Sequence, residues 1–186
     1  MKTVSIIYFS GSGHTTQLAQ SVNKGASKVE GIISNLIAIN SKDIIDGRYQ
    51  NDEVFTTLDS SDAIIFGTAT YMGGISAQFK AFADASVGSW FAGKWKDKLA
   101  TGFTVSGTPA GDKFNTMQYM NTLAMQHGMI WISLGETHYD PNGINRLGAW
   151  AGAIAQSTDN IPMAEGDMLT GEVLGKRVAD MVLRFN

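Results

Sequence analysis

Cysteine is absent from the 186 residues of the chain. Its absence excludes disulfides, thiolate metal sites, cysteine nucleophiles and Cys-x-x-Cys redox chemistry. The three histidines are widely separated, and the sequence has neither a His-Glu-x-x-His motif nor a paired-carboxylate pattern, so no metal site is expected. Any redox function would therefore depend on a bound organic cofactor.

A strong net charge and long hydrophobic runs are also missing. The net charge of −3 argues against nucleic acid or an anionic membrane as a partner. The first apolar run, Val4 to Phe9, is too short for a signal peptide or a membrane span. Because 44% of the residues are hydrophobic and 17% are charged, the composition is typical of a globular protein. We therefore expect a single cytoplasmic domain over residues 1–186.

The most informative stretch is a glycine-rich loop, Tyr8-Phe9-Ser10-Gly11-Ser12-Gly13-His14-Thr15-Thr16. It follows the apolar run 4–9, which is typical of a buried strand, and it precedes a helical pattern over residues 15–28. Unpaired N–H groups at a helix N-terminus favour a negatively charged ligand, and glycine lets the backbone approach it closely. We interpret the loop as a phosphate cradle formed by Ser10, Gly11, Ser12, Gly13, His14 and Thr15.

Two common phosphate loops do not fit this stretch. A Walker A loop ends in Gly-Lys-Ser/Thr, but the chain has no Lys or Arg between Lys2 and Lys24. A Rossmann loop has a third glycine where Thr16 stands and an acidic residue where the second strand ends, at Asn40. A loop rich in hydroxyls and free of cations suits a single phosphate monoester, as in the FMN site of flavodoxins. The alternative is a turn that only joins a strand to a helix.

Strand and helix patterns alternate five times along the chain. Strands are predicted over residues 4–9, 32–39, 62–67, 99–105 and 129–134, with helices after the first four and a last helix over 167–185. This order indicates a three-layer α/β fold with a five-stranded parallel sheet in the order 2-1-3-4-5 and helices on both faces. Residues 42–50 are interpreted as a polar linker, and residues 135–166 as a long functional or interface segment.

Two more loops of the same composition follow the third and fourth strands, at residues 68–76 and 106–111. In the order 2-1-3-4-5 the first, third and fourth strands are neighbours, so their three loops should meet at one edge of the sheet. Ligands of such sheets bind outside the carboxyl ends of the strands, near the point where the strand order reverses. The three loops together predict a phosphorylated, planar cofactor.

With these loops in view, the chain resembles the flavodoxin-like NAD(P)H:quinone oxidoreductases of the tryptophan-repressor-binding-protein (WrbA) type. The first loop of that family ends in Gly-His, like Gly13-His14, and His-Gly-Met before a strand is matched by residues 127–129. The family's Pro-Thr-Arg-Phe-Gly-Asn-Met corresponds to residues 69–75, and its Ser-Thr-Gly-Thr-Gly-Gly to residues 105–110. The second loop lacks the family's Pro and Arg, and Pro109 replaces a glycine.

The resemblance implies an FMN cofactor whose phosphate lies on residues 10–15. It also implies that the second and third loops border the isoalloxazine ring, through Thr70, Tyr71, Met72 and Gly73, and through Ser106, Gly107, Thr108, Pro109, Ala110 and Gly111. It further implies a tetramer in which Trp90 and His127 shape the pocket over the flavin. We therefore expect a homo-oligomer, either a dimer or a tetramer.

The function expected on this basis is FMN-dependent, two-electron reduction of quinones or similar flat acceptors by NADPH or NADH. His127 could bond the acceptor oxygen or act as an acid near neutral pH, but it could equally serve only to close a helix. The alternative function is a flavodoxin-type carrier that passes single electrons between protein partners. A third possibility is a member that binds a partner and no flavin. Trp95, between lysines, is expected at the surface or at a subunit contact, and Trp131 in the core.

Overall fold

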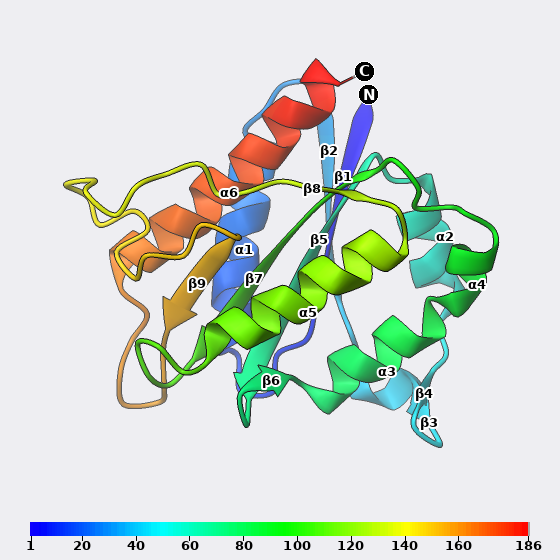
Figure 1. The fold of residues 1–186 in the computed structure, drawn as a ribbon, viewed down its shortest axis with the longest axis horizontal. Coiled ribbons are helices and arrows are strands. Elements are labelled where there is room, and N and C mark those ends of the chain that lie inside the picture. Colours follow the sequence, from blue (N-terminus) through cyan, green and yellow to red (C-terminus); the bar gives the residue numbers. More distant parts are fainter. Residues whose placement is uncertain (186) are drawn as a thin grey trace.

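The computed structural model describes residues 1–185 and shows an α/β fold with helices on both faces of a mostly parallel sheet (Figure 1). The sheet order is β2 (Ile32–Ala38), β1 (Lys2–Tyr8), β5 (Ala63–Tyr71), β7 (Leu99–Ser106) and β8 (Ile130–Trp131). Two further strands join it: β6 (Gly74–Ile75) pairs antiparallel with β5, and β9 (Ala153–Gln156) pairs parallel with β7. The predicted flavodoxin-like fold is therefore confirmed, but its sheet has seven strands rather than five.

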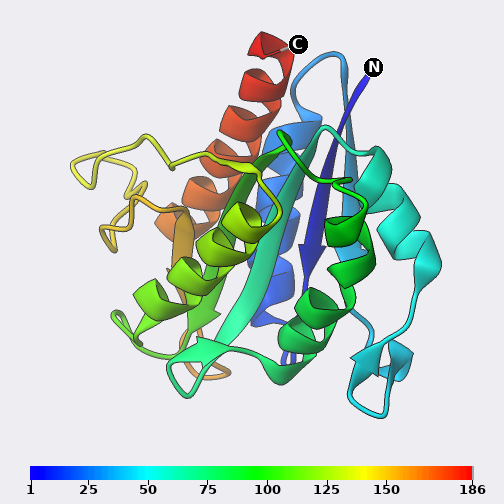
Figure 2. The same cartoon turned by 45° about the vertical axis from the view of Figure 1, so that its right-hand side comes forward.

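The helices form two layers, which Figures 1 and 2 show on opposite faces of the sheet. One layer contains α1 (His14–Ser27) and α6 (Glu165–Arg184). The other contains α2 (Asp52–Ser60), α3 (Ala77–Ala85), the short α4 (Val87–Phe91) and α5 (Lys113–Gln126). No helix within residues 1–185 is both long enough and apolar enough to cross a membrane.

The central strands are buried on both faces, as their mostly apolar sequences predict. In β1, Val4 and Ile6 pack with α1 and α6, while Ile7 points to the core under α3 and α5. In β5, Ile65 packs in the core with α1 and α6, and Ile64 packs in the core under α3 and α5. Because the strands are parallel, their carboxyl ends meet at one edge of the sheet.

Two short strands, β8 and β9, share the fifth position in the sheet, whereas the sequence predicts a single strand there. Only Ile130 and Trp131 pair with the start of β7, and the chain then leaves the sheet. It returns as β9, which pairs with Phe103 to Ser106 at the other end of β7. At the return, the Gly152 backbone packs so closely on Gly102 that an added Cβ would lie 2.1 Å from the Gly102 oxygen. The predicted strand 129–134 is therefore shorter, and the segment 135–166 contains a strand of its own.

Two smaller expectations were also wrong. Residues 42–50 form a 3₁₀ turn (Ser41–Asp43) and a hairpin of β3 (Ile44–Ile45) and β4 (Arg48–Tyr49), not an unstructured linker. Trp95 is fully buried rather than at the surface, because its indole packs on Phe66 and Phe82 and its Nε1–H donates to Asp59 Oδ1 at 2.7 Å. Trp131 is half-buried against the same core.

Helices α1 and α6 touch through their backbones. A Cβ added to Gly25 would lie 1.9 Å from the backbone oxygen of Glu172, and one added to Gly175 would lie 1.9 Å from that of Val22. Neither glycine has a positive φ, so close approach and not backbone conformation requires them. The two helices can therefore cross at this distance only because side chains are absent at the crossing.

Candidate functional site

A cavity of about 280 Å³ lies at the carboxyl edge of the sheet, where the loops after β1, β5, β7 and β9 meet. Each loop reaches this edge because the strand before it is parallel to its neighbours. The lining residues are Ser12, His14 and Thr15; Ala69, Thr70 and Tyr71; Val105, Ser106 and Gly107; and Ser157, Thr158 and Asp159.

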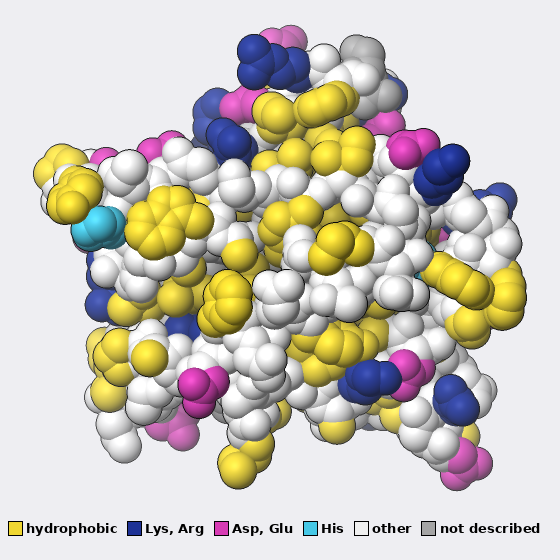
Figure 3. All heavy atoms as spheres, in the orientation of Figure 1, with side chains coloured by type: hydrophobic (Ala, Val, Ile, Leu, Met, Phe, Trp, Pro, Cys, Tyr) yellow, Lys and Arg dark blue, Asp and Glu magenta, His cyan; other side chains and the backbone are white. Residues whose placement is uncertain are grey.

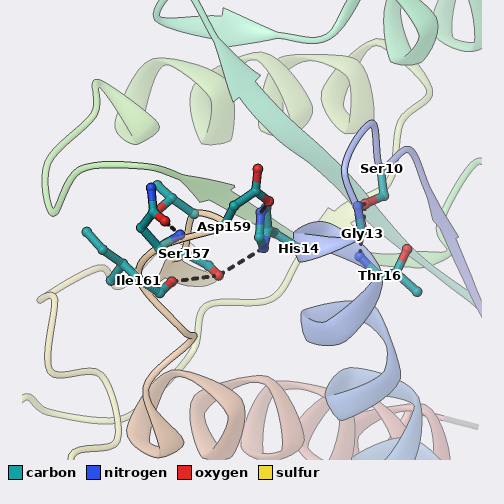
Figure 4. Close-up of polar contacts among 9 residues, drawn as sticks. Ser10, Gly13, His14, Thr16, Ser157, Asp159 and Ile161 are labelled. Atoms are coloured by element: carbon teal, nitrogen blue, oxygen red, sulfur yellow. Dashed lines mark hydrogen bonds and ion pairs between the residues drawn. The ribbon is translucent and has the colours of Figure 1, made fainter.

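The first loop has backbone donors without partners beside this cavity. Gly13 has a φ of 91° and turns the chain into α1. Ser10 Oγ accepts hydrogen bonds from the N–H groups of Gly13 at 3.1 Å and Thr16 at 3.2 Å (Figure 4). Within the described chain, the N–H groups of Gly11, Ser12, His14 and Thr15 have no partner. Four unpaired donors at a helix N-terminus, with no Lys or Arg in the loop, suit the phosphate of a monoester.

The loop after β9 holds His14 from the other side (Figure 4). Ser157 Oγ lies 3.0 Å from His14 Nδ1, and Asp159 Oδ1 lies 3.2 Å from His14 Nε2. Ser157 Oγ also donates to the Ile161 oxygen at 3.2 Å. His14 therefore joins the first loop to the fourth and fixes one wall of the cavity.

The second loop is a tight hairpin between β5 and β6. Met72 and Gly73, at its tip, have φ values of 48° and 75°, the pair of positive angles that a type I′ turn requires. The Tyr71 ring lies over the first loop, because a Cβ on Gly11 would lie 2.4 Å from the Tyr71 hydroxyl. The Thr70 hydroxyl points inward, 2.8 Å from the hydroxyls of both Thr104 and Thr116. Thr70 thus contributes to the cavity wall but uses its hydroxyl within the protein.

The third loop is tied down by internal bonds. Ser106 Oγ donates to the Thr108 oxygen at 3.0 Å and accepts from Lys113 Nζ at 2.8 Å. Gly111 has a φ of 52°, and a Cβ there would lie 2.1 Å from Ser106 Oγ. The tight loop therefore needs glycine at this position, and it holds Ser106 and Gly107 at the cavity.

The structure brings together part of the predicted cofactor-binding set. Seven of the predicted residues line the cavity: Ser12, His14, Thr15, Thr70, Tyr71, Ser106 and Gly107. The others shape the loops without lining it: Ser10, Gly11, Gly13, Met72, Gly73, Thr108, Pro109, Ala110 and Gly111. Sequence reasoning missed the fourth loop. Its Ser157-Thr158-Asp159-Asn160 run follows the alternating strand 153–156 and has the same hydroxyl-rich composition as the other loops, which could have revealed it.

His127 and Trp90 lie elsewhere in the chain. Lys113, which starts α5, is at the carboxyl edge, and His127 caps the other end of α5, about 20 Å away for a helix of this length. Trp90 lies at that same end, with its Nε1–H bonded to the Gln126 oxygen at 2.9 Å. Within one chain, neither residue reaches the cavity. Their predicted roles would require a second copy of the chain.

His127 is also unsuited to acid chemistry at neutral pH. It is buried, its Nε2 lies 2.9 Å from Ser86 Oγ, and its ring stacks on Trp95. Ser86 Oγ donates to the Ala83 oxygen, so His127 Nε2 carries the proton and buried Nδ1 has no partner. Burial lowers the pKa of His127 to about 4, with a smaller opposing effect from Asp59. The expected acid near neutral pH is thus a neutral imidazole that closes α5.

This environment predicts a loss of stability in acid. The unfolded chain binds a proton at His127 near pH 6.5, whereas the folded chain binds it only near pH 4. The contribution to stability is complete above about pH 6.5 and falls as the pH drops toward 4, by up to about 3 kcal/mol. Urea unfolding of His127→Gln, which can still bond Ser86, should show a weaker pH dependence in this window than the parent. Equal pH dependence in both proteins would contradict the assignment.

A larger cavity, of about 610 Å³, lies between α2 and the α3–α4 region. Asp52 and Asp59 line it, and no Lys or Arg does. Two carboxylates repel a phosphate more than the single carboxylate of Asp159 in the cavity at the carboxyl edge. Among residues 1–185, no cluster of three or more His, Asp or Glu side chains could hold a metal ion.

Comparison with known proteins agrees with the geometry of the edge. The family described as "NADPH-dependent FMN reductase" matches residues 4–138. The chain belongs to this family. A flavodoxin of Pseudomonas aeruginosa, FldP, is 38% identical over 187 aligned positions, which cover 96% of each chain. Members of this FMN reductase family are flavodoxin-like, FMN-binding oxidoreductases, and the WrbA-type resemblance is confirmed by a solved relative.

That relative is a flavodoxin, WrbA-like protein from Agrobacterium tumefaciens. It is 40% identical, superposes with a TM-score of 0.80, and is covered over 100% of both chains. FerB of Paracoccus denitrificans, an NAD(P)H:(acceptor) oxidoreductase, has a TM-score of 0.61 at 18% identity, with 99% of this chain and 98% of that chain covered. At that identity the likeness to FerB concerns the fold alone.

Proposed function

We propose that the protein binds FMN in the cavity at the carboxyl edge and uses it to reduce quinones or similar flat acceptors with NADPH or NADH. The observation that carries the proposal is the first loop, where four N–H groups without partners lie at the start of α1, beside a cavity that Ser12, His14 and Thr15 line. A phosphate monoester fits this cradle, and family membership supports FMN as its source. When bound, FMN supplies the hydride and electron chemistry.

The residues of the chain bind and orient the cofactor in this proposal. The N–H groups of Gly11, Ser12, His14 and Thr15 hold the phosphate. Tyr71 and the backbone around Ser106 and Gly107 border the ring, and the Gly107 N–H is a candidate donor to its pyrimidine edge. His14 keeps the fourth loop against the first, which limits water at the phosphate. No side chain of a single copy is assigned to proton transfer.

The second candidate is a carrier of single electrons between proteins. It is favoured by the name of the Pseudomonas relative, a flavodoxin, at 38% identity. The enzyme is favoured by the family match to FMN reductases over residues 4–138 and by the modest net charge of −3, because carriers usually have a strongly acidic docking face. We place the enzyme first.

We also propose a homo-oligomeric, cytoplasmic protein. Figure 3 shows exposed hydrophobic side chains over α4, at its right, and over the segment between β8 and β9, at its left. Trp90 and Phe91 belong to the first group, and Tyr139 and Trp150 to the second. An interface that brought α4 onto the cavity of a neighbouring copy would place the exposed Trp90 at that cavity, as its predicted role requires. Size-exclusion chromatography with light scattering measures the oligomeric state directly.

The deciding experiment is an anaerobic visible spectrum of the FMN-reconstituted protein before and after addition of NADPH or NADH. We expect a protein-bound flavin band that is bleached directly to the fully reduced form and recovers when a quinone is added. A protein that retains no flavin would contradict the cofactor assignment. A flavin band untouched by either nicotinamide, yet reduced one electron at a time by dithionite, would identify the carrier instead.

A further inference from the structure

Lys113 is a buried cation directly behind the third loop. It is the first residue of α5, and its side chain is only 1% exposed. Its Nζ donates to Ser106 Oγ at 2.8 Å and to the Thr108 oxygen at 2.7 Å. Ser106 itself lines the cavity. The ammonium is therefore one hydrogen bond away from the proposed flavin site.

The charge of Lys113 has no direct counter-ion. The carboxylate of Asp167 raises the pKa of Lys113, but it is already bound by other groups. Arg146 Nε binds its Oδ1 at 2.7 Å, and the Arg146 NH2 group and the Gln156 N–H bind its Oδ2 at 2.8 and 3.0 Å. Within the described chain, no carboxylate forms an ion pair with Lys113 Nζ. Lys113 and Arg146 thus face the single carboxylate of Asp167, and the carboxylate of Asp159 also lines the cavity. A buried charge of this kind is costly unless an anion approaches it.

We propose that Lys113 is a positioning residue that acts through Ser106 to favour the reduced, anionic form of bound flavin. The inference rests on the proposed function. When nicotinamide delivers a hydride, FMN gains two electrons and one proton at N5 and becomes an anion with its charge at N1 and the adjacent C2 oxygen. The donor leaves as NADP⁺ or NAD⁺. A fixed cation behind the loop stabilises this anion but gains much less from the neutral oxidised ring.

Lys113 supplies a positive charge that the loops themselves lack. No motif of the first three loops supplies it, since residues 3–23 contain no Lys or Arg and the third loop itself contains none.

The proposed role of Lys113 also predicts how the midpoint potential of bound flavin depends on pH in the unmodified protein. Burial lowers the pKa of Lys113 to about 8; Asp167 of α6 opposes this shift, and Arg146, from the segment between β8 and β9, adds to it. A new negative charge on the flavin would raise that pKa again. Above about pH 8, reduction would thus take up a second proton, and the midpoint potential would fall by about 59 instead of about 30 mV per pH unit.

The test compares Lys113→Met with Lys113→Arg and with Lys176→Met, a matched control at an exposed lysine of α6. Dissociation constants are measured for oxidised FMN and, anaerobically, for reduced FMN. In Lys113→Met the affinity for the reduced form should drop at least about tenfold more than that for the oxidised form, which lowers the midpoint potential by about 30 mV. The steeper fall of the midpoint potential above about pH 8 should also be absent in Lys113→Met. Lys113→Arg should retain the parent ratio, and Lys176→Met should match the parent.

Other outcomes separate a failure of the inference about Lys113 from a failure of the proposed function. Equal weakening of oxidised and reduced FMN in Lys113→Met would show that the lysine only supports the loop, and would overturn the inference. A parent protein without the steep slope above pH 8 would overturn it as well, even if Lys113→Met fails to fold. A parent protein that binds no FMN at all would instead refute the proposed function.

Discussion

Replacement of Ser10 with aspartate should abolish FMN binding while leaving the protein folded. Ser10 Oγ accepts hydrogen bonds from Gly13 and Thr16 at the start of α1, and a carboxylate at this position can accept the same bonds. It would stabilise the helix N-terminus by about 0.5–1 kcal/mol. The same charge would repel a phosphate on the neighbouring N–H groups, and we expect at least a hundredfold weaker binding, since unit charges at about 4 Å interact by about 4 kcal/mol near a protein surface.

Fluorescence titration with FMN measures the affinity, and thermal unfolding of the apoprotein measures the stability. Ser10→Asn is the matched control, because it keeps the acceptor without the charge and should lose much less affinity. Riboflavin, which lacks the phosphate, should bind Ser10→Asp about as well as it binds the parent. Tight FMN binding to Ser10→Asp would show that the phosphate lies elsewhere.

Replacement of Gly175 with alanine should destabilise the fold by about 3 kcal/mol. Helix propensity alone predicts the opposite sign, since alanine in a helix interior is favoured over glycine by about 1 kcal/mol. The added Cβ, however, would lie 1.9 Å from the Val22 oxygen, on the backbone of α1. A backbone atom cannot turn aside as a flexible side chain can, so α1 and α6 would have to move apart.

Urea unfolding followed by circular dichroism measures this effect. Lys176→Ala, at the adjacent and exposed position, should change the free energy of unfolding by less than about 0.5 kcal/mol, because it removes only a solvent-exposed pair with Asp180. A Gly175→Ala protein as stable as the parent would mean that the two helices do not cross as closely as described.

The sheet and three of its four loops could be predicted because they depend on local patterns. Mostly apolar runs such as 4–9 and 62–67 indicate strands buried on both faces, and the loops after parallel strands lie at a common edge. The glycine and hydroxyl composition of these loops then indicates a phosphate site. These parts of the fold could be predicted without knowing any long-range contact, because loops after parallel strands lie at one edge of the sheet.

The features that escaped prediction depend on partners distant in sequence. The strand β9 has four residues and follows a long excursion, so its pairing with Phe103 to Ser106 gives little local signal. Trp95 lies between lysines in the sequence, which indicates an exposed position. It is buried because Asp59, which is distant in sequence, accepts the hydrogen bond of its indole N–H. In the sequence, Lys113 is an ordinary lysine in the first turn of a helix. Its hydrogen bonds to Ser106 and Thr108 depend on the conformation of the third loop.

The split of the fifth sheet position affects the order in which the site can form during synthesis. The first loop is complete once α1 has begun, but the wall formed by Ser157, Thr158 and Asp159 depends on β9, which leaves the ribosome after five-sixths of the chain. Until then, the end of β7 that carries the third loop has an open edge, and His14 lacks both of its partners. The cavity is therefore completed late in synthesis, well after the first loop that would hold the phosphate.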